Sequence, residues 1–169
     1  MKSEELKSKQ APLKEKYRKT PEAALITLKA QGEIGEGITC KIETGKAIIE
    51  AGLHEATGGT GLTLCSGDLL LEALVACAGV TLNALATSIG VELRDAAIRA
   101  EGDLDFRGTL GVSKEAPVGF QNIRLFFDLD TDASEEQVAS LKKLTERYCV
   151  VYQTLRQPPQ IATNYQVQR

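Results

Sequence analysis

A chain of 169 residues with 43% hydrophobic and 25% charged residues has the size and composition of one globular domain, which excludes disorder over its whole length. Its net charge of -3 is mild, so we expect no nucleic-acid partner, because such binding requires a clustered basic surface. The start of the chain lacks the apolar segment of a signal peptide, and Glu72 interrupts the longest apolar stretch, so we expect a cytoplasmic protein with no membrane partner.

The first residues differ in character from the rest. Lys and Glu dominate up to residue 19, Pro12 interrupts this pattern and Pro21 ends it, which predicts an exposed charged helix or arm. We expect residues 1–23 to form this arm and to pack on a partner subunit. Residues 24–169 are expected to form a single α+β domain.

The segment that follows predicts an antiparallel meander. Residues 25–30 have the pattern of a strand and residues 32–37 that of a turn. Ile38, Cys40 and Ile42 alternate with polar residues, which indicates a second strand with Cys40 in its core. A hairpin turn then leads to a third strand over residues 47–51.

A glycine-rich loop occupies residues 54–61. No Gly-Lys-Ser/Thr follows it, so a phosphate-binding loop of the Walker type is excluded. His54 opens this loop. An isolated loop histidine is more often an exposed side chain than a functional one, with an approach to a thiol as the alternative.

The most apolar part of the chain predicts a helix that ends at Gly90. Ser66 is its expected N-cap, and Asp68 lies in the first turn, where the helix dipole favours a negative charge. Apolar residues between Leu69 and Leu85 occupy nearly every face. We therefore expect a central helix enclosed by a sheet and a partner protomer.

Two further strands are predicted over residues 91–105 and 122–129, with a loop between them over residues 107–119. The order of strands, buried helix, strands and helices favours α+β over a doubly wound α/β fold.

The remaining helices are predicted from capping and periodicity. Ser134 is expected to cap a helix with Val138, Leu141 and Leu144 on its apolar side. A further helix is expected to begin near Thr145 and to carry Cys149. Pro158 and Pro159 end it, and residues 161–167 form a closing strand.

The four cysteines, Cys40, Cys65, Cys77 and Cys149, contain no CxxC pair, and the chain has one histidine. This pattern argues against a zinc site, and we expect neither a metal nor a cofactor. A free cysteine on a helix is most often a small buried side chain. Cys65, just before the central helix, is a candidate spare thiol, with packing as the favoured interpretation.

Two segments resemble motifs of the OsmC/Ohr superfamily. Residues 66–82, SGDLLLEALVACAGVTL, are similar to the central family helix, in which an acidic residue, a Leu-rich run and small residues precede the first family cysteine, here Cys77. Residues 144–155, LTERYCVVYQTL, resemble the second cysteine motif, here with Cys149. In that motif proline commonly follows the cysteine, and Val150 stands in its place. The order of elements fits the family after Ala24.

The resemblance implies an intertwined homodimer in which sheets from both protomers enclose two long helices. It also implies thiol-dependent reduction of organic hydroperoxides. Cys77 would attack as the thiolate and become a sulfenic acid, Cys149 would resolve it as a disulfide, and an external dithiol would restore both thiols. Because burial raises a thiol pKa, the attacking thiolate needs a nearby cation.

The chain departs from its relatives in the groups around the thiol. Peroxide-reducing members are expected to use an arginine from the N-terminal strands and a glutamate ahead of the first cysteine. Residues 24–51 contain no arginine, and the glutamate position falls on Gly67. Arg18, Asp68 and Glu72 are the candidate substitutes, although a structural ion pair is the favoured role of Glu72. These departures favour an alternative, a non-catalytic OsmC-like protein that binds a small apolar ligand or senses redox state at the dimer interface.

Overall fold

The computed structural model describes residues 2–5, 8, 10–11, 15, 19–20, 31–34, 39–43, 48–111 and 113–168. Arg18 and the strand predicted over residues 25–30 lie outside the described residues. Most of the predicted arm lies outside them too.

The N-terminal sheet has the order β1-β2-β3-β4, formed by Gln31–Ile34, Thr39–Glu43, Ile48–Gly52 and Leu64–Cys65. The first three strands pair antiparallel, which confirms the meander, and β4 pairs parallel to β3. β1 lies where a turn was predicted. Its ladder with β2, from Gln31 opposite Glu43 to Ile34 opposite Cys40, outweighs the local turn preference of the glycines.

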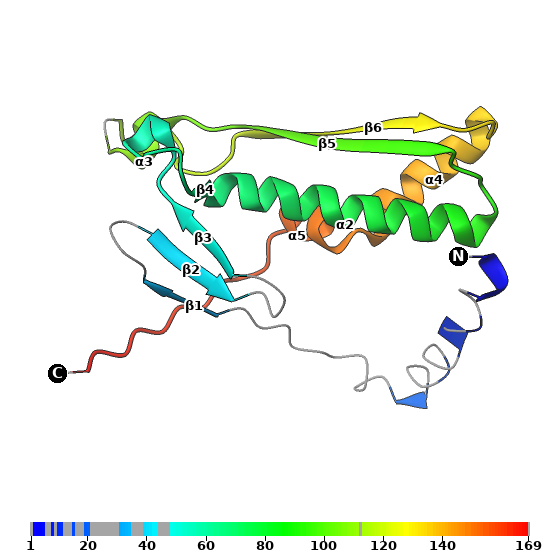
Figure 1. Cartoon of the computed structure of the whole chain (residues 1–169), viewed down its shortest axis with the longest axis horizontal. Coiled ribbons are helices and arrows are strands. Elements are labelled where there is room, and N and C mark those ends of the chain that lie inside the picture. Colours follow the sequence, from blue (N-terminus) through cyan, green and yellow to red (C-terminus); the bar gives the residue numbers. More distant parts are fainter. Residues whose placement is uncertain are drawn as a thin grey trace.

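A single long helix, α2 (Ser66–Ile89), runs through the molecule (Figure 1). Leu and Ala are strong helix formers, and Gly90, with φ of 75°, ends the helix as predicted. The N-cap is Cys65 and not Ser66. Cys65 ends β4 with an extended backbone, so the helix starts one residue earlier than the capping preference of serine predicted.

The buried side chains of α2 recur every four residues, at Leu74, Ala78, Leu82 and Ala86. This spacing places them on one face of the helix, and α2 contacts β4, β5, α4 and α5. Its length and mean hydropathy of 1.9 also suit a membrane span, but the core helix of a water-soluble protein meets the same criterion.

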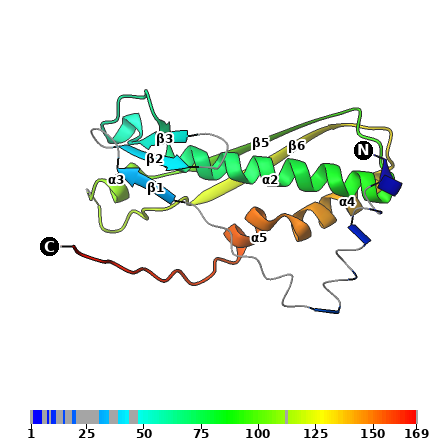
Figure 2. The ribbon, with the colours of Figure 1, turned by 60° about the horizontal axis from the view of Figure 1, so that its bottom comes forward.

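The strands β5 (Asp95–Asp103) and β6 (Asn122–Asp130) form a long antiparallel hairpin over one side of α2 (Figure 1 and Figure 2). Ala96, Ile98 and Phe127 pack against the core cluster around Leu82 and Leu141. The connection predicted as a loop contains a short helix, α3 (Phe106–Thr109), which Asp105 caps through its side chain.

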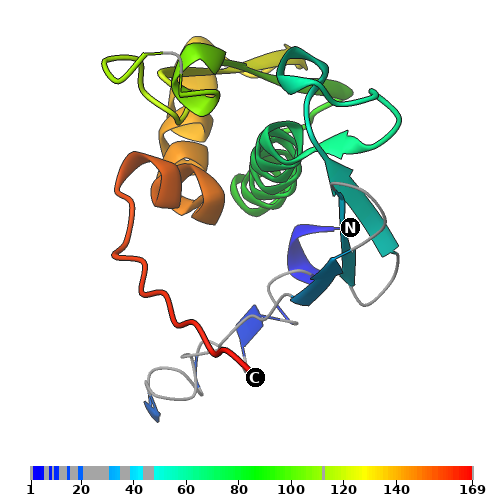
Figure 3. The ribbon, with the colours of Figure 1, turned by 90° about the vertical axis from the view of Figure 1, so that its left-hand side faces the viewer.

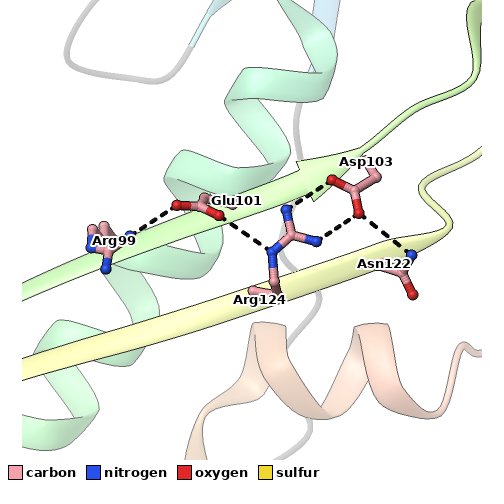
Figure 4. A network of polar contacts seen from close by, with 5 residues as sticks. All are labelled: Arg99, Glu101, Asp103, Asn122 and Arg124. Atoms are coloured by element: carbon pink, nitrogen blue, oxygen red, sulfur yellow. Dashed lines mark hydrogen bonds and ion pairs between the residues drawn. The ribbon is translucent and has the colours of Figure 1, made fainter.

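The opposite face of this hairpin carries a ladder of charges (Figure 4). Arg124 donates to Asp103 at 2.6 and 2.8 Å and to Glu101 at 3.3 Å, and Arg99 donates to Glu101 at 2.9 Å. The hydrogen bonds from Arg124 hold the pKa of the Asp103 carboxyl below its usual range. The guanidinium of Arg99 also lies 3.9 Å from the Phe126 ring centroid.

The helices α4 (Glu135–Tyr148) and α5 (Val150–Arg156) lie beside α2, opposite the N-terminal sheet (Figure 3). Ser134 caps α4 in a reciprocal capping box with Gln137, which confirms the predicted start. The predicted break near Thr145 is wrong. Helical hydrogen bonding continues through residue 148, and the chain breaks at Cys149.

The C-terminal segment after α5 is extended but unpaired in this chain, so the closing strand predicted over residues 161–167 is not formed. It leads away from the body of the molecule (Figure 1). Ile161, Tyr165 and Val167 are more than 80% exposed. A strand requires a neighbouring edge to receive its hydrogen bonds, and none of the described strands of this chain meets the segment.

Candidate thiol site

The fold brings Cys77 and Cys149 together. Cys77 lies in the middle of α2, and Cys149 lies at the break between α4 and α5, both of which pack on α2. Both are free thiols, and they lie close enough for each to shift the pKa of the other. Cys149 is 1% exposed and Cys77 is half-buried. Solvent therefore reaches the pair mainly through Cys77.

The surroundings of Cys77 favour its thiolate. Burial raises the pKa of the Cys77 thiol, but hydrogen bonds from the Val151 N–H, the Cys149 thiol, the Val150 N–H and the Thr81 hydroxyl outweigh it. The net result is a pKa of Cys77 below its ordinary value.

The surroundings of Cys149 favour its neutral thiol. Burial raises the pKa of Cys149, and although the Tyr152 N–H opposes this effect, the adjacent Cys77 sulfur raises the pKa further. The two thiols thus have opposite tendencies. This arrangement pairs a nucleophilic sulfur with a neighbouring thiol that keeps its proton.

A cation was expected at this site, but the groups that lower the Cys77 pKa most are neutral. Two of them are main-chain N–H groups at the start of α5, and a third is the hydroxyl of Thr81. Sequence reasoning missed Thr81, although its position four residues after Cys77 places it on the same face of the helix.

The predicted acidic residues lie away from the thiol pair. Asp68 lines a cavity of about 370 Å³ at the start of α2, together with His54 and Cys65. It precedes Cys77 by nine helical residues, or about 14 Å along the helix axis. Glu72 is exposed on α2, and its predicted ion pair across a dimer stays a prediction.

His54 has a structural role in that cavity. Its Nδ1 accepts a hydrogen bond of 3.0 Å from the Ala56 N–H, which caps the short helix η2 (Glu55–Thr57). Its ring stacks on Phe106 with centroids 4.9 Å apart. The side chain is half-buried, so the expectation of an exposed histidine is wrong. Cys65, which lines the same cavity, is also half-buried. Cys40 lies in β2, and its predicted place in the core falls outside the described part of the chain.

A larger cavity of about 520 Å³ lies between β6 and the helices α4 and α5. Leu74, one turn before Cys77, and Tyr152, three residues after Cys149, bring it close to the thiol pair. Most other lining residues are apolar: Phe120, Ile123, Leu125, Phe127 and Leu155. The charged residues on its wall are Lys142, Glu146 and Arg156. Such a cavity suits an apolar molecule with a polar end.

Comparisons with known proteins give one consistent result. The family model described as OsmC-like protein matches residues 59–164. No curated protein matches the chain.

Among solved structures, an OsmC-like protein from Mycoplasma pneumoniae is similar with a TM-score of 0.67 and 14% identity, over 79% of this chain and 89% of that one. An organic hydroperoxide resistance protein OsmC from Legionella pneumophila has a TM-score of 0.61 and 18% identity, over 79% and 92%. The organic hydroperoxide resistance protein OhrB of Bacillus subtilis has a TM-score of 0.53 and 21% identity, over 80% and 94%. At these identities the likeness shows the fold, which agrees with the predicted OsmC-like α+β architecture.

Proposed function

Because the chain belongs to the OsmC-like protein family, we propose that it is a thiol-dependent peroxidase that reduces organic hydroperoxides through Cys77 and Cys149. The observation that carries this proposal is the contact between the two thiols, one favoured as thiolate and the other as thiol. Two of the similar structures are organic hydroperoxide resistance proteins, which supports the same substrate class.

The proposed reaction begins at Cys77. Its thiolate attacks the terminal oxygen of the hydroperoxide, the O–O bond breaks, and the departing alkoxide takes a proton to become the alcohol. The sulfur is oxidised to a sulfenic acid while the peroxide is reduced. The neighbouring Cys149 thiol then attacks the sulfenic sulfur, which forms the disulfide and releases water.

An external dithiol completes the cycle. It reduces the Cys77–Cys149 disulfide by two exchange steps and is itself oxidised to a disulfide. A reducing compartment such as the cytoplasm would supply this partner. We further propose that the protein acts as a homodimer, because an exposed apolar face of α2 adjoins the site.

The test is a thiol titration before and after one equivalent of cumene hydroperoxide, with peptide mapping of any new disulfide. We expect rapid loss of two thiols and a Cys77–Cys149 link. Cys77→Ser should abolish turnover, whereas Cys65→Ser, which replaces a thiol outside the pair, serves as the matched control. Unchanged turnover in Cys77→Ser would exclude the mechanism.

The 520 Å³ cavity favours a second candidate function, the binding of a small apolar molecule without catalysis. A fluorescent fatty-acid probe would test it in the Cys77→Ser/Cys149→Ser double variant. Retained binding with no peroxide turnover by the wild type would favour this function. Absence of binding in both proteins would exclude it.

A further inference from the structure

The break between α4 and α5 has an unusual hydrogen-bond arrangement. The Cys149 N–H still donates to the Thr145 carbonyl at 3.0 Å, so α4 is regular up to that point. Cys149 itself is extended, with φ of -72° and ψ of 109°, and the first regular bond of α5 runs from the Gln153 N–H to the Cys149 carbonyl at 3.0 Å. Cys149 therefore ends one helix and begins the next.

The extended residue changes the partner of the next main-chain N–H. In a continuous helix, the Val150 N–H would donate to the Glu146 carbonyl. That carbonyl instead accepts from the side-chain amide of Gln153, at 2.7 Å. Among the described residues, no backbone carbonyl accepts from the Val150 N–H.

α5 packs on α2, and hydrogen bonding from the Val150 and Val151 N–H groups is among the causes that lower the pKa of the Cys77 thiol. Val150 is 69% exposed. Any contribution of this residue to the thiol pair therefore comes from its main chain. The Gln153 side chain therefore occupies the Glu146 carbonyl at the same break where the Val150 N–H is available to Cys77.

We propose that Gln153 is a positioning residue for Cys77: by bonding the Glu146 carbonyl it stabilises the break between α4 and α5, which directs the Val150 N–H to the Cys77 sulfur. The inference rests on the proposed role of Cys77 as the attacking thiolate. It also gives a reason for the departure from the family motif. Proline, the residue commonly found after the second cysteine, has no N–H to donate, whereas Val150 has one.

The first test replaces Val150 by proline. Proline suits the first position of a helix, and the extended backbone of Cys149 is compatible with a following proline, so Val150→Pro removes the N–H with little change of fold. Val150→Ala removes the same side-chain bulk and keeps the N–H. The difference between the two variants isolates the hydrogen bond.

The measurement is the rate of iodoacetamide modification of Cys77 against pH, mapped by mass spectrometry in the full chain. We expect Val150→Pro to move the midpoint upward by about one pH unit relative to Val150→Ala, because a hydrogen bond to the thiolate is lost. Coincident profiles of these two variants would overturn the proposal.

The second test addresses Gln153. Gln153→Met keeps the length of the side chain but cannot donate to the Glu146 carbonyl, and we expect an upward shift in the same direction. Thr154→Ala, at an exposed position on the same helix, is the matched control. A Gln153→Met profile that coincides with that of Thr154→Ala would overturn the positioning role.

Both tests are independent of peroxide. A shifted alkylation profile in a protein that does not reduce hydroperoxides would reject the proposed function and retain the inference. An unshifted profile in an active peroxidase would do the reverse.

Discussion

Two outward-facing regions of the chain contrast in chemistry. On the outer face of β5 and β6, charged side chains pair with one another across the strands (Figure 4). On α2, the exposed positions Leu70, Ala73, Ala76 and Val80 are apolar, and Val80 is 73% exposed. The charged groups on β5 and β6 are paired with one another or solvated by water. The exposed positions on α2 leave apolar area in contact with water along a long helix.

The contrast indicates which side of the molecule would meet the proposed second copy. The uncovered residues recur at three- and four-residue intervals, so they form one stripe on α2. The stripe runs past Cys77, which is itself half-buried. A second copy of the chain on this stripe would complete the burial of α2.

The largest effect is expected inside the chain. Leu82→Ala removes a side chain that is 3% exposed from the core cluster, and we expect a loss of about 2–5 kcal/mol in the free energy of unfolding. Urea denaturation measures it. Leu62→Ala makes the same change at an 89% exposed position and should cost less than about 0.5 kcal/mol. Equal losses would show that Leu82 is not part of the core.

A charge on the stripe is expected to act on association. Val80→Asp would bury an unpaired carboxylate under a second copy, so we expect the dimer to weaken by about 3 kcal/mol, on the order of a hundredfold in Kd. Sedimentation equilibrium measures this change. Ser140→Asp, on the exposed side of α4, is the control and should leave association unchanged. A monomeric wild type would contradict the prediction at once.

The third prediction concerns pH at the edge of the stripe. The pKa of Cys77 is lowered and that of Cys149 is raised, so at a pH just below the ordinary thiol range only Cys77 is ionised to a useful extent. We expect iodoacetamide to modify Cys77 at least about tenfold faster there, since the thiolate is the reactive form. The preference should shrink as pH rises and vanish in urea-unfolded protein. Faster modification of Cys149 in the folded protein would contradict the assignment.

The smallest effect is expected on the charged surface. Arg124→Gln removes the central cation of the ladder, but all its partners are open to water, which solvates the freed carboxylates. We expect no measurable change in the urea midpoint or in dimer affinity. A clear loss of association in this variant would place the interface on β5 and β6 instead of on α2.

Much of the fold was predictable because its signals are local. The helix that ends at Gly90, the long strands β5 and β6, and the Ser134 cap each follow from periodicity or capping within a few residues. β1 was missed because its pairing with β2 overrides the turn preference of Gly32 and the glycines that follow it. The strand predicted over residues 161–167 is not formed for the complementary reason: an alternating sequence cannot supply the neighbouring strand edge that a strand needs.

The candidate site was also predictable in one part and not in another. The resemblance selected Cys77 and Cys149, and the structure brings the two side chains into contact. The main-chain N–H groups that lower the Cys77 pKa were not predictable, because every residue except proline carries one. Only the break at Cys149 and the amide of Gln153 determine which N–H groups meet the sulfur.

The unpaired C-terminal segment affects the tendency of the protein to aggregate. Residues 157–168 carry no charge, and Ile161, Thr163, Tyr165 and Val167 alternate with small or polar side chains. An exposed, uncharged segment with strand alternation is the kind of sequence that recruits further copies into aggregates. A chain in which nothing covers this segment is therefore at risk of precipitation. If the proposed second copy covered the segment, assembly would protect the protein from aggregation.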